Sequence, residues 1–249
     1  MADGAPVVGA NMAEVKFRSD MTVELIKHSA SDADVLWAAR VSTKGELSLA
    51  DVDAEPERSA GLINFLMRDR HGTPFEHSTM TFYIQAPIFV FREFMRHRTF
   101  SYNEESGRYR TLAAVFYLPG PDRRLVQTGK PGAYKFTAGS PEQHELVTQA
   151  TMEACRQSYA AYETMLEGGI AREVARTVLP VGLYSSMYAT CNARALMNFL
   201  GLRTQRPDAA FPSFPQREIE MVAEKMEAEW AAVMPITHAA FNANGRVSP

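Results

Sequence analysis

The chain has 249 residues, of which 46% are hydrophobic and 22% are charged. It is therefore long enough to bury a sizeable core, and its charge content argues against wholesale disorder. Its 26 basic and 29 acidic residues leave a formal net charge of -3. This balance excludes a general electrostatic attraction to nucleic acid or to an anionic membrane. A binding site for an anion must therefore be a local concentration of arginine.

No apolar run approaches the roughly 20 residues that a membrane span needs, and the first residues show no basic region followed by an apolar one, as a signal peptide would. We expect residues 1–20 to form a flexible extension and residues 21–249 to form a single domain. Cys155 and Cys191 form no metal-type pair and imply no disulfide framework. The sequence therefore predicts a cytoplasmic, reduced protein with no metal site and with neither a membrane nor a nucleic acid as partner.

Hydrophobic periodicity predicts a mixture of helices and strands along the chain. Strand character is expected around 22–27, followed by a helix that starts at the capping signal of Ser31 and Asp34. The other expected elements are a helix over 57–70, a half-buried strand over 78–86, a helix over 88–95, a long amphipathic helix over 141–167, a short helix over 170–179, a strand over 183–190, a helix over 193–202 and a final helix starting at Pro215. Prolines and glycines mark 119–140 as a surface excursion and 206–215 as a loop. Helices mixed with a mostly antiparallel sheet predict the α+β class.

The most unusual stretch runs from Arg92 to Arg110 and holds five arginines against three acidic residues, with interleaved polar and aromatic side chains. Guanidinium groups match phosphate oxygens in paired hydrogen bonds, and aromatic rings and guanidinium planes stack on flat heterocycles. Asparagine and glutamate can read the polar edge of a ring such as uracil or flavin. The stretch therefore indicates a site for a nucleotide-sized anion with a planar base. The alternative is a solvated basic helix end, which the apolar residues upstream and the shaped loop at Asn103, Ser106 and Gly107 make less favourable.

Eight residues inside this stretch form a recognisable pattern: Arg96, His97, Arg98, Ser101, Asn103, Glu104, Ser106 and Arg108. The pattern R-H-R-x-x-S-x-N-E-x-S-x-R resembles the signature of the flavin-dependent thymidylate synthases, the ThyX family. Residues 71–77, 175–180 and 192–203 resemble further blocks of that family in the expected order, and the resemblance spans roughly 22–240. It implies the thymidylate synthase-complementing-protein-like fold and a homotetramer whose active sites are shared between subunits.

The resemblance also implies a function, the reductive methylation of dUMP to dTMP by a FAD-dependent thymidylate synthase. The carbon donor would be 5,10-methylenetetrahydrofolate, which leaves as tetrahydrofolate, and NADPH-reduced FAD would be the hydride source. No cysteine of the enzyme is required, and Ser106 has no histidine at a motif-like spacing that would activate it as a nucleophile. On this interpretation, residues 21–249 form a single catalytic domain.

By resemblance, the contacts to FAD are expected from Thr73, Glu76, Arg96, His97, Arg98, Glu104, Asn192, Arg194 and Asn198. The contacts to dUMP are expected from Glu93, Arg96, Glu104, Glu105, Ser106, Gly107, Arg108, Arg176 and Arg203. Among these, Ser106 to Arg108 would form the phosphate-binding turn, and a neighbouring subunit would supply Arg176. His71 and Tyr109 are expected in the folate and NADPH region. Arg203 is the expected catalytic residue, because a cation beside the uracil stabilises the negative charge that develops as N3 ionises.

Several of these residues also have simpler structural interpretations. His97 taken alone fits a histidine packed at a helix end, Asn192 a helix N-cap, and Arg203 a cation that complements a helix C-terminus. Glu93 stands where many relatives have glutamine, and 204–215 is longer and richer in proline and phenylalanine than the family's usual link.

Two other functions stay open at this point. A non-catalytic RNA-binding protein would use the arginine and tyrosine residues of the same stretch, with salt-sensitive RNA affinity and no bound flavin. A flavoprotein reductase would oxidise NADPH without forming dTMP.

Overall fold

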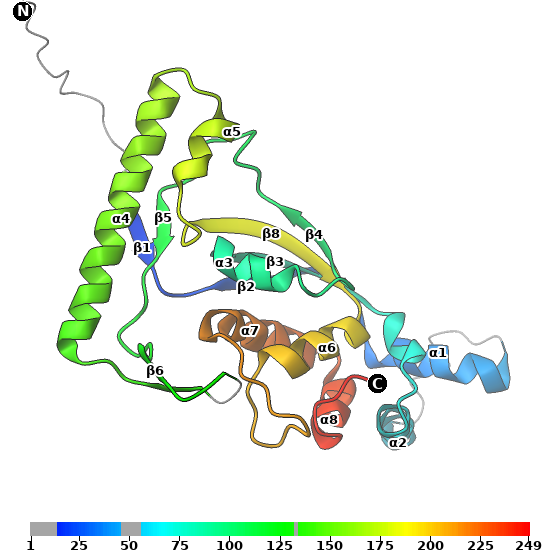
Figure 1. The fold of residues 1–249 in the computed structure, drawn as a ribbon. Coiled ribbons are helices and arrows are strands. Elements are labelled where there is room, and N and C mark those ends of the chain that lie inside the picture. Colours follow the sequence, from blue (N-terminus) through cyan, green and yellow to red (C-terminus); the bar gives the residue numbers. More distant parts are fainter. Residues whose placement is uncertain (1–13, 46–55, 132–133) are drawn as a thin grey trace, which may run out of the picture. The chain divides into compact units, whose positions relative to one another are not determined.

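The computed structural model describes residues 14–45, 56–131 and 134–249, which fall into two compact units (Figure 1). Within the described ranges, the first unit consists of residues 14–19 together with Ser106–Tyr184, and the second of Asp20–Glu105 together with Ser185–Pro249. The first unit is therefore formed mainly by the middle of the chain and the second unit by its two flanks. The expectation of one catalytic domain over 21–249 stays a prediction.

The second unit is organised around a four-stranded sheet with the order β2-β3-β8-β4. Its strands are β2 (Thr22–Ser29), β3 (Thr79–Pro87), β8 (Tyr184–Cys191) and β4 (Ser101–Glu104). β2 pairs antiparallel with β3, and β4 pairs antiparallel with β8. Along β3, Met80, Phe82 and Ile84 are fully buried and the residues between them are half-buried, which confirms the predicted alternation. The mixed helix-and-sheet class with an antiparallel sheet is confirmed as well. The sequence does not predict the strand β4, since a shaped loop is expected in this region.

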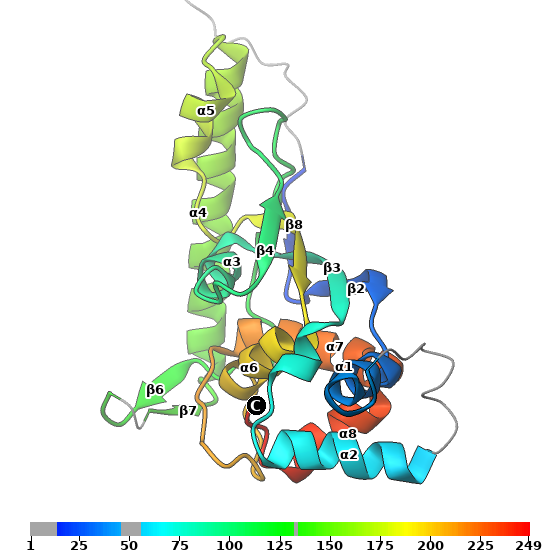
Figure 2. The same cartoon turned by 90° about the vertical axis from the view of Figure 1, so that its right-hand side faces the viewer.

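The helices of the second unit are α1 (Asp32–Lys44), α2 (Pro56–Arg68), α3 (Ile88–Phe94), α6 (Ala193–Arg203), α7 (Arg217–Val233) and α8 (Pro235–Ala243), with the 3-10 helix η2 (Thr73–Glu76). α7 packs against β2 and β3 and also against α6 and α8, so the core lies between the sheet and these helices. Trp230 on α7 and Phe241 on α8 are both fully buried, with ring centroids 5.8 Å apart. α2 and α8 lie side by side in both ribbon views (Figure 2).

Local sequence signals explain where several helices begin. The backbone N–H of Ser31 donates to Asp34 Oδ2 at 2.7 Å, which confirms the capping signal ahead of α1. Asn192 caps α6, because its side-chain oxygen accepts a 2.8 Å hydrogen bond from the Ala195 N–H. The sequence pattern does not predict α8, since Pro235 starts it directly after α7 and the apolar spacing hides the break between the two helices.

The first unit combines one long helix with short strands. α4 (Pro141–Glu167) has the predicted bounds, and β1 (Lys16–Arg18) pairs in parallel with β5 (Val115–Tyr117). The other elements described there are α5 (Arg172–Ala175), the 3-10 helix η3 (Arg176–Val178), β6 (Val126–Thr128) and β7 (Lys135–Thr137). In the core, the Tyr159 hydroxyl donates to the Leu112 carbonyl at 2.9 Å, and the Leu112 N–H donates to the Tyr162 hydroxyl oxygen at 3.2 Å.

Some features of the first unit differ from the predictions. β1 lies inside the expected flexible extension, because β5 provides its hydrogen-bond partners. The surface excursion contains the β6–β7 hairpin. The short helix expected before Pro180 is divided into α5 and η3, because its last turn tightens into 3-10 form. On α4, Leu146 is 68% exposed although it belongs to the predicted apolar stripe, and burial begins only at Cys155.

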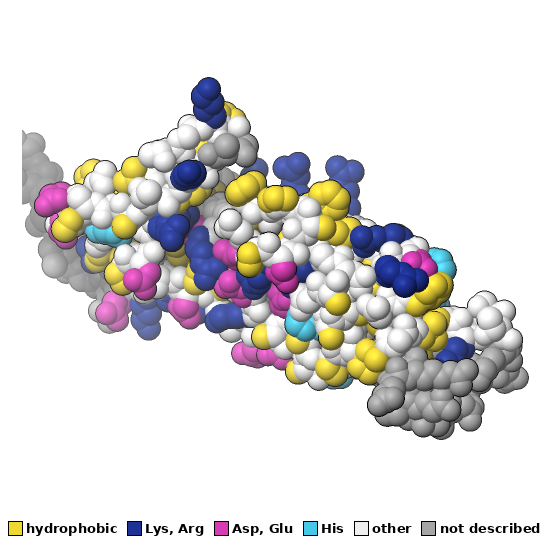
Figure 3. All heavy atoms as spheres, turned by 90° about the horizontal axis from the view of Figure 1, so that it is seen from below, with side chains coloured by type: hydrophobic (Ala, Val, Ile, Leu, Met, Phe, Trp, Pro, Cys, Tyr) yellow, Lys and Arg dark blue, Asp and Glu magenta, His cyan; other side chains and the backbone are white. Residues whose placement is uncertain are grey.

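The surface carries both basic and acidic side chains. Seen from below, it shows basic and acidic side chains next to one another near the centre of the view (Figure 3). Ion pairs of this kind join Arg206 and Arg217 to Glu220 and Glu224 in the second unit. Among the helices of the described ranges, none has the length and apolar character that a bilayer crossing requires.

Candidate functional site

A cavity of about 340 Å³ lies at the start of α6 in the second unit. Its lining consists of Glu76, Thr99, Asn192, Arg194, Ala195, Asn198, Ser248 and Pro249. These residues come from η2, from the turn that follows α3, from α6 and from the segment after α8. Four of them, Glu76, Asn192, Arg194 and Asn198, are residues for which the sequence predicts contacts with FAD. Folding therefore brings four of the expected FAD residues together at one cavity.

Arg194 provides the positive charge of this cavity. Its Nη1 donates to Glu76 Oε1 at 2.5 Å, and its Nε donates to the Pro249 carbonyl oxygen at 2.7 Å. The side chain nevertheless stays 45% exposed. Gly72 makes this arrangement possible, because a Cβ at that position would lie 2.6 Å from Arg194 Cζ. The cavity therefore contains a fixed guanidinium group that its protein partners cover only in part.

One face of α6 presents polar side chains to the cavity. Arg194 and Asn198 are four residues apart and exposed, whereas most of the helix is buried. At the N-terminus of α6, Asn192 accepts from Ala195, and the Ala193 N–H donates to the buried Ser78 hydroxyl oxygen at 3.1 Å. A helix N-terminus next to an arginine favours a negatively charged ligand. These residues thus fit a cofactor that carries phosphate groups and polar ring edges.

At the opposite end of α6, Arg203 makes three contacts within the second unit. Its Nη1 donates to Glu93 Oε2 at 2.6 Å, and its Nη2 donates to the Glu93 carbonyl oxygen at 3.5 Å. Its Nε donates to His97 Nε2 at 3.1 Å. The side chains of Arg203 and Glu93 are 20% and 26% exposed. The guanidinium is therefore oriented by α3 and by the turn after it, and it remains partly accessible.

His97 is buried beside Arg203. Its ring meets Phe199 edge to face with centroids 4.9 Å apart. Burial, together with the charge of Arg203, lowers the pKa of His97 to about 4, so the ring is neutral at pH 7. Because a guanidinium can only donate, Nε2 is the acceptor, and we assign the ring proton to Nδ1 from this contact. The structure thus shows a packed, neutral histidine that positions Arg203, and its contact with FAD stays a prediction.

Glu93 has an unusual electrostatic setting. Burial raises the pKa of its carboxyl group, Arg203 acts in the opposite direction, and Glu218 raises it further. An arginine at 2.6 Å would by itself lower the pKa, so burial outweighs the ion pair here. Glu93 therefore takes up a proton more readily than an exposed glutamate, and its hold on Arg203 weakens when it does.

The arginines near the end of α3 carry charge that no acidic residue of the described ranges balances. Arg92, Arg96 and Arg98 are all exposed, and within the described part of the chain none of them has an acidic partner. Arg92 lies in the last turn of α3, and Arg96 and Arg98 lie within the four residues that follow the helix. This stretch therefore carries a local excess of positive charge that an anionic ligand can neutralise.

The turn at Ser106, Gly107 and Arg108 lies in the first unit. The Arg108 N–H donates to Ser106 Oγ at 3.3 Å, which closes the turn locally. A Cβ at Gly107 would lie 3.1 Å from Arg176 Cδ, so glycine allows Arg176 to pack closely against the turn. Within one chain, folding therefore places Arg176 against the expected phosphate-binding residues.

Arg108 is held in this turn by an exposed ion pair. Its Nε donates to Glu173 Oε2 at 2.9 Å, and both side chains are 54% exposed. Surface pairs of this kind contribute about 0–1 kcal/mol. A phosphate group can therefore replace Glu173 as the partner of Arg108.

The other expected residues occupy the following positions. Thr73 begins η2 and is exposed, and the exposed His71 ring lies edge-on to Phe65 with centroids 5.6 Å apart. Glu104 ends β4, and the Glu105 N–H donates to the Ser186 carbonyl at 2.8 Å. Tyr109 is 78% exposed in the first unit.

The chain is similar to known proteins over nearly its whole length. A family model described as thymidylate synthase complementing protein matches residues 24–236. The chain is 68% identical over 243 residues to the flavin-dependent thymidylate synthase of Streptomyces coelicolor, and the match covers 97% of this chain and 99% of that protein. It is 59% identical over 233 residues to the flavin-dependent thymidylate synthase of Tropheryma whipplei, with 94% and 97% covered. The chain belongs to the thymidylate synthase complementing protein family.

A solved structure supports the same fold for this member of the thymidylate synthase complementing protein family. The UMP/dUMP methylase PolB from Streptomyces cacaoi, bound with 5-Br dUMP, is 57% identical with a TM-score of 0.89, and the match covers 94% of this chain and 100% of that one. The resemblance to the flavin-dependent thymidylate synthases is thereby confirmed.

Sequence reasoning misses four cavity residues of this family member. Thr99 occupies a variable position of the signature, and Ala195 has no polar side chain to mark it. Ser248 and Pro249 lie beyond the region that the family model matches. No local pattern points to the last two, because only the fold brings them to the cavity.

Proposed function

We propose that this chain is a flavin-dependent thymidylate synthase, which converts dUMP to dTMP by reductive methylation and releases tetrahydrofolate. The carbon donor is 5,10-methylenetetrahydrofolate, and FAD reduced by NADPH is the hydride source. One observation carries the proposal: Glu76, Asn192, Arg194 and Asn198 meet at a single polar cavity. They do so in a chain that is 68% identical to a flavin-dependent thymidylate synthase.

The residues around the cavity suit an anionic cofactor. Arg194 contributes positive charge, and Asn192 and Asn198 contribute amide groups that can pair with polar ring edges. The exposed Arg96 and Arg98 add donors that match phosphate oxygens. Together with the expected contacts from Thr73, Glu76, His97 and Glu104, these side chains bind FAD.

Arg203 is the residue that activates the nucleotide. Its guanidinium stabilises the negative charge that develops at N3 of the uracil, which raises the nucleophilicity of C5. Glu93 and the neutral His97 keep this guanidinium oriented while the site is without nucleotide. Glu93 can release Arg203 to the uracil at reduced cost, because burial raises its pKa, and it then contacts dUMP itself.

The phosphate of dUMP binds at Ser106, Gly107 and Arg108. Arg176 packs against this turn within one chain, so a subunit that supplies Arg176 to a neighbour also supplies the turn. We therefore extend to the turn the expectation that a neighbouring subunit supplies Arg176. The protein forms a homotetramer in which each active site combines Arg203 of one subunit with the phosphate turn of another.

The remaining assignments follow the family resemblance. Arg96, Glu104 and Glu105 contact dUMP, and His71 and Tyr109 lie in the folate and NADPH region. The enzyme acts in the cytoplasm on small molecules, with neither nucleic acid nor membrane as partner.

UMP is a second candidate for the methyl acceptor. The similar protein PolB is described as a UMP/dUMP methylase, and its structure with bound 5-Br UMP matches this chain with 56% identity and a TM-score of 0.87. UMP differs from dUMP only in its 2′-hydroxyl group. Assaying both nucleotides side by side under identical conditions therefore decides which acceptor this chain prefers.

The test of the main proposal uses the purified protein. Its visible spectrum should show bound flavin, and dTMP should form when dUMP, 5,10-methylenetetrahydrofolate and NADPH are added. Arg203→Ala should keep the flavin and lose dTMP formation. A colourless protein that FAD cannot reconstitute and that makes no dTMP contradicts the proposal and favours RNA binding. NADPH oxidation without dTMP indicates a reductase.

A further inference from the structure

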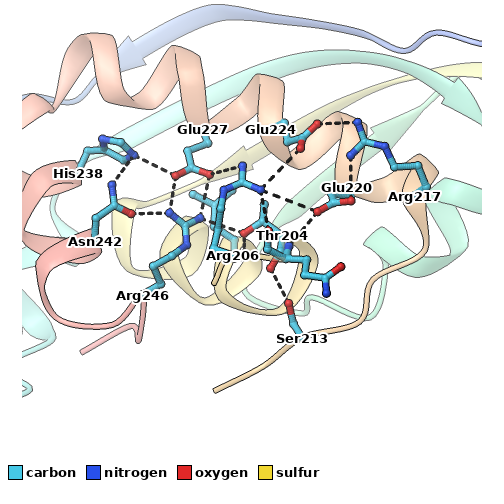
Figure 4. Close-up of polar contacts among 12 residues, drawn as sticks. Thr204, Arg206, Ser213, Arg217, Glu220, Glu224, Glu227, His238, Asn242 and Arg246 are labelled. Carbon is cyan, nitrogen blue, oxygen red and sulfur yellow. Dashed lines mark hydrogen bonds and ion pairs between the residues drawn. The ribbon is translucent and has the colours of Figure 1, made fainter. Parts of the chain in front are cut away.

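Residues 245–249 begin in a buried polar network of the second unit (Figure 4). Arg246 is only 5% exposed. Its Nη1 donates to Glu227 Oε1 at 2.7 Å, and its Nη2 donates to Glu227 Oε2 at 2.8 Å and to Thr204 Oγ1 at 2.9 Å. Asn242 and His238 complete the surroundings, with contacts to Arg246 and to Glu227 respectively. Arg246 therefore fixes this segment to α6 and α7.

The backbone around Arg246 has little freedom to move. Gly245 and Arg246 have φ values of +71° and +58°, so the chain turns sharply through two successive left-handed residues. The Ala210 N–H donates to the Gly245 carbonyl at 2.9 Å. A Cβ at Gly201 would lie 2.9 Å from the Arg246 carbonyl oxygen, so α6 approaches the segment directly. The direction in which the chain continues beyond Arg246 is therefore fixed.

Beyond this anchor, residues 247–249 hold Arg194 at the cavity. The Ser248 hydroxyl donates to the Arg194 carbonyl oxygen at 3.0 Å, and the Pro249 carbonyl accepts from Arg194 Nε at 2.7 Å. Arg70 Nη1 secures the segment from the other side by donating to the Val247 carbonyl at 2.8 Å. The segment thus binds both the backbone and the side chain of Arg194.

These contacts leave a defined part of Arg194 for a ligand. Nε is engaged by Pro249 and Nη1 by Glu76, while Nη2 has no partner among the described residues. An arginine side chain that is already oriented loses less conformational entropy when it binds an anion. Ser248 and Pro249 also form part of the cavity wall.

We propose that residues 247–249, anchored by Arg246, are a positioning element of the flavin site that orients Arg194 and closes one wall of its cavity. The inference rests on the proposed function, because it takes FAD as the ligand of this cavity. It adds to that function a segment that the family model does not reach, since the match ends at residue 236.

The first test is a chain that stops after Arg246. We expect FAD to bind the apo-protein of this variant about tenfold more weakly, which corresponds to about 1.4 kcal/mol, while the melting temperature of the apo-protein stays close to that of the full chain. The dissociation constant is measured by titrating apo-protein with FAD and following flavin fluorescence. Combining the truncation with Arg194→Met should give much less than the product of the two separate effects, because the segment acts through Arg194.

A second variant leaves the chain length unchanged. Gly72→Ala places a Cβ 2.6 Å from Arg194 Cζ and 2.7 Å from the Pro249 carbonyl oxygen, so it should separate the two and weaken FAD binding to a similar degree. Gly61→Ala is the matched control, because a Cβ there has no neighbour within 4 Å. It should leave the FAD affinity unchanged.

The outcomes separate the two proposals. Unchanged FAD affinity in both the truncated chain and Gly72→Ala overturns the positioning role while the proposed function stands. The positioning role is also overturned if the truncation and Arg194→Met weaken FAD binding independently, so that their effects multiply in the combined variant. The segment would then act on FAD binding through a residue other than Arg194. If the truncated chain does not fold, Gly72→Ala and its control decide. A full-length protein that binds no FAD contradicts the proposed function itself.

Discussion

The Glu227–Arg246 pair of the second unit and the Arg108–Glu173 pair of the first unit join the same two chemical groups at nearly the same distance, 2.7 Å and 2.9 Å. Their surroundings differ. The side chains of Arg246 and Glu227 are 3% and 11% exposed, whereas those of Arg108 and Glu173 are both 54% exposed. Arg246 also has further hydrogen bonds, to Thr204 and Asn242.

The distance between the two charged groups therefore does not by itself determine the role of an ion pair. A buried pair with additional hydrogen bonds cannot lose one partner without leaving a charge unsatisfied in the interior. An exposed pair loses little when water or a ligand replaces one partner. The Glu93–Arg203 pair, with side chains 26% and 20% exposed, lies between these cases. We therefore propose that the buried pair anchors the segment after α8 and that the intermediate pair orients the arginine that activates the nucleotide. In the exposed pair, phosphate can replace the carboxylate.

The largest effect is expected from breaking the buried pair. Arg246→Met leaves Glu227 in the interior without its bidentate partner, so the free energy of unfolding should fall by about 3–5 kcal/mol. Urea denaturation measures this change. Replacing Glu227 by Met in the same chain should recover part of the loss, because this removes a buried carboxylate whose remaining partners are His238 and Arg206. A loss below about 1 kcal/mol would mean that water reaches Glu227 and that the pair is not an anchor.

The next effect concerns the intermediate pair. Arg203→Ala removes the cation proposed to stabilise the ionised uracil, and kcat for dTMP should fall about 10²–10³-fold, as when one preorganised donor is lost from an active site. Steady-state kinetics with dUMP measures it, and the flavin spectrum checks that the cofactor is retained. Arg217→Ala is the control, because the acidic partners of Arg217 among the described residues are Glu220 and Glu224 on its own helix. Full activity in Arg203→Ala would remove Arg203 from the catalytic role.

A smaller effect is expected at the exposed pair. Arg108→Ala removes the proposed charge-assisted contact to phosphate, and such contacts are typically worth about 1.5–3 kcal/mol, so dUMP affinity should fall roughly 10- to 100-fold. The free energy of unfolding should change by less than about 1 kcal/mol. Isothermal titration with dUMP and a parallel melting curve give both values. Glu173→Gln should leave dUMP binding at least as strong, and weaker binding in that variant would show that Glu173 does not compete with phosphate.

The smallest effect is a pH dependence of stability at His97. Burial and Arg203 lower its pKa from 6.5 to about 4, so the unfolded chain binds a proton that the folded chain excludes. Stability should therefore fall as the pH drops through this window, by about 1 kcal/mol once solvent screening is allowed for. His97→Gln keeps an acceptor for Arg203 and should flatten this dependence in melting curves recorded between pH 4 and 6.5. Identical curves for both proteins would mean that folding does not lower the pKa of His97.

The carboxyl group of Glu227 provides a comparison, because its pKa in the folded protein is lower than that of His97. Burial by itself raises its pKa, but hydrogen bonds from His238 and Arg246 lower it to about 2. A carboxylate whose pKa is lowered by folding stabilises the folded protein at pH values above its pKa in the unfolded chain. This contribution is lost as the pH falls through its pKa in the folded protein. As the pH falls, the two groups therefore destabilise the protein in successive pH ranges, first His97 and then Glu227.

Much of the local structure could be predicted because its causes are local. The Ser31 and Asn192 caps act within three residues, and the alternation of β3 needs only the neighbouring positions. The eight-residue signature and the blocks around it are enough to single out Glu76, Arg194 and Arg203. In each case the relevant residues lie close together in the sequence or form a recognisable pattern.

Other features depend on contacts between distant parts of the chain. β1 forms only because β5 lies beside it, and α8 follows α7 without a break in the apolar pattern. Arg203 meets Glu93 across 110 positions of sequence, and Arg70 meets Val247 across 177. Single-sequence patterns carry no information about which residues meet at such separations.

Sequence patterns were therefore sufficient to identify the family, most of the helices, and the arginines to which we assign the binding chemistry. The partners that hold those arginines depend on the complete fold: residues 247–249 for Arg194, Glu93 and His97 for Arg203, and Glu173 for Arg108. The reason is physical. Helix caps and strand alternation arise from neighbouring residues, whereas the orientation of a guanidinium group depends on the burial and hydrogen bonds that the complete fold creates.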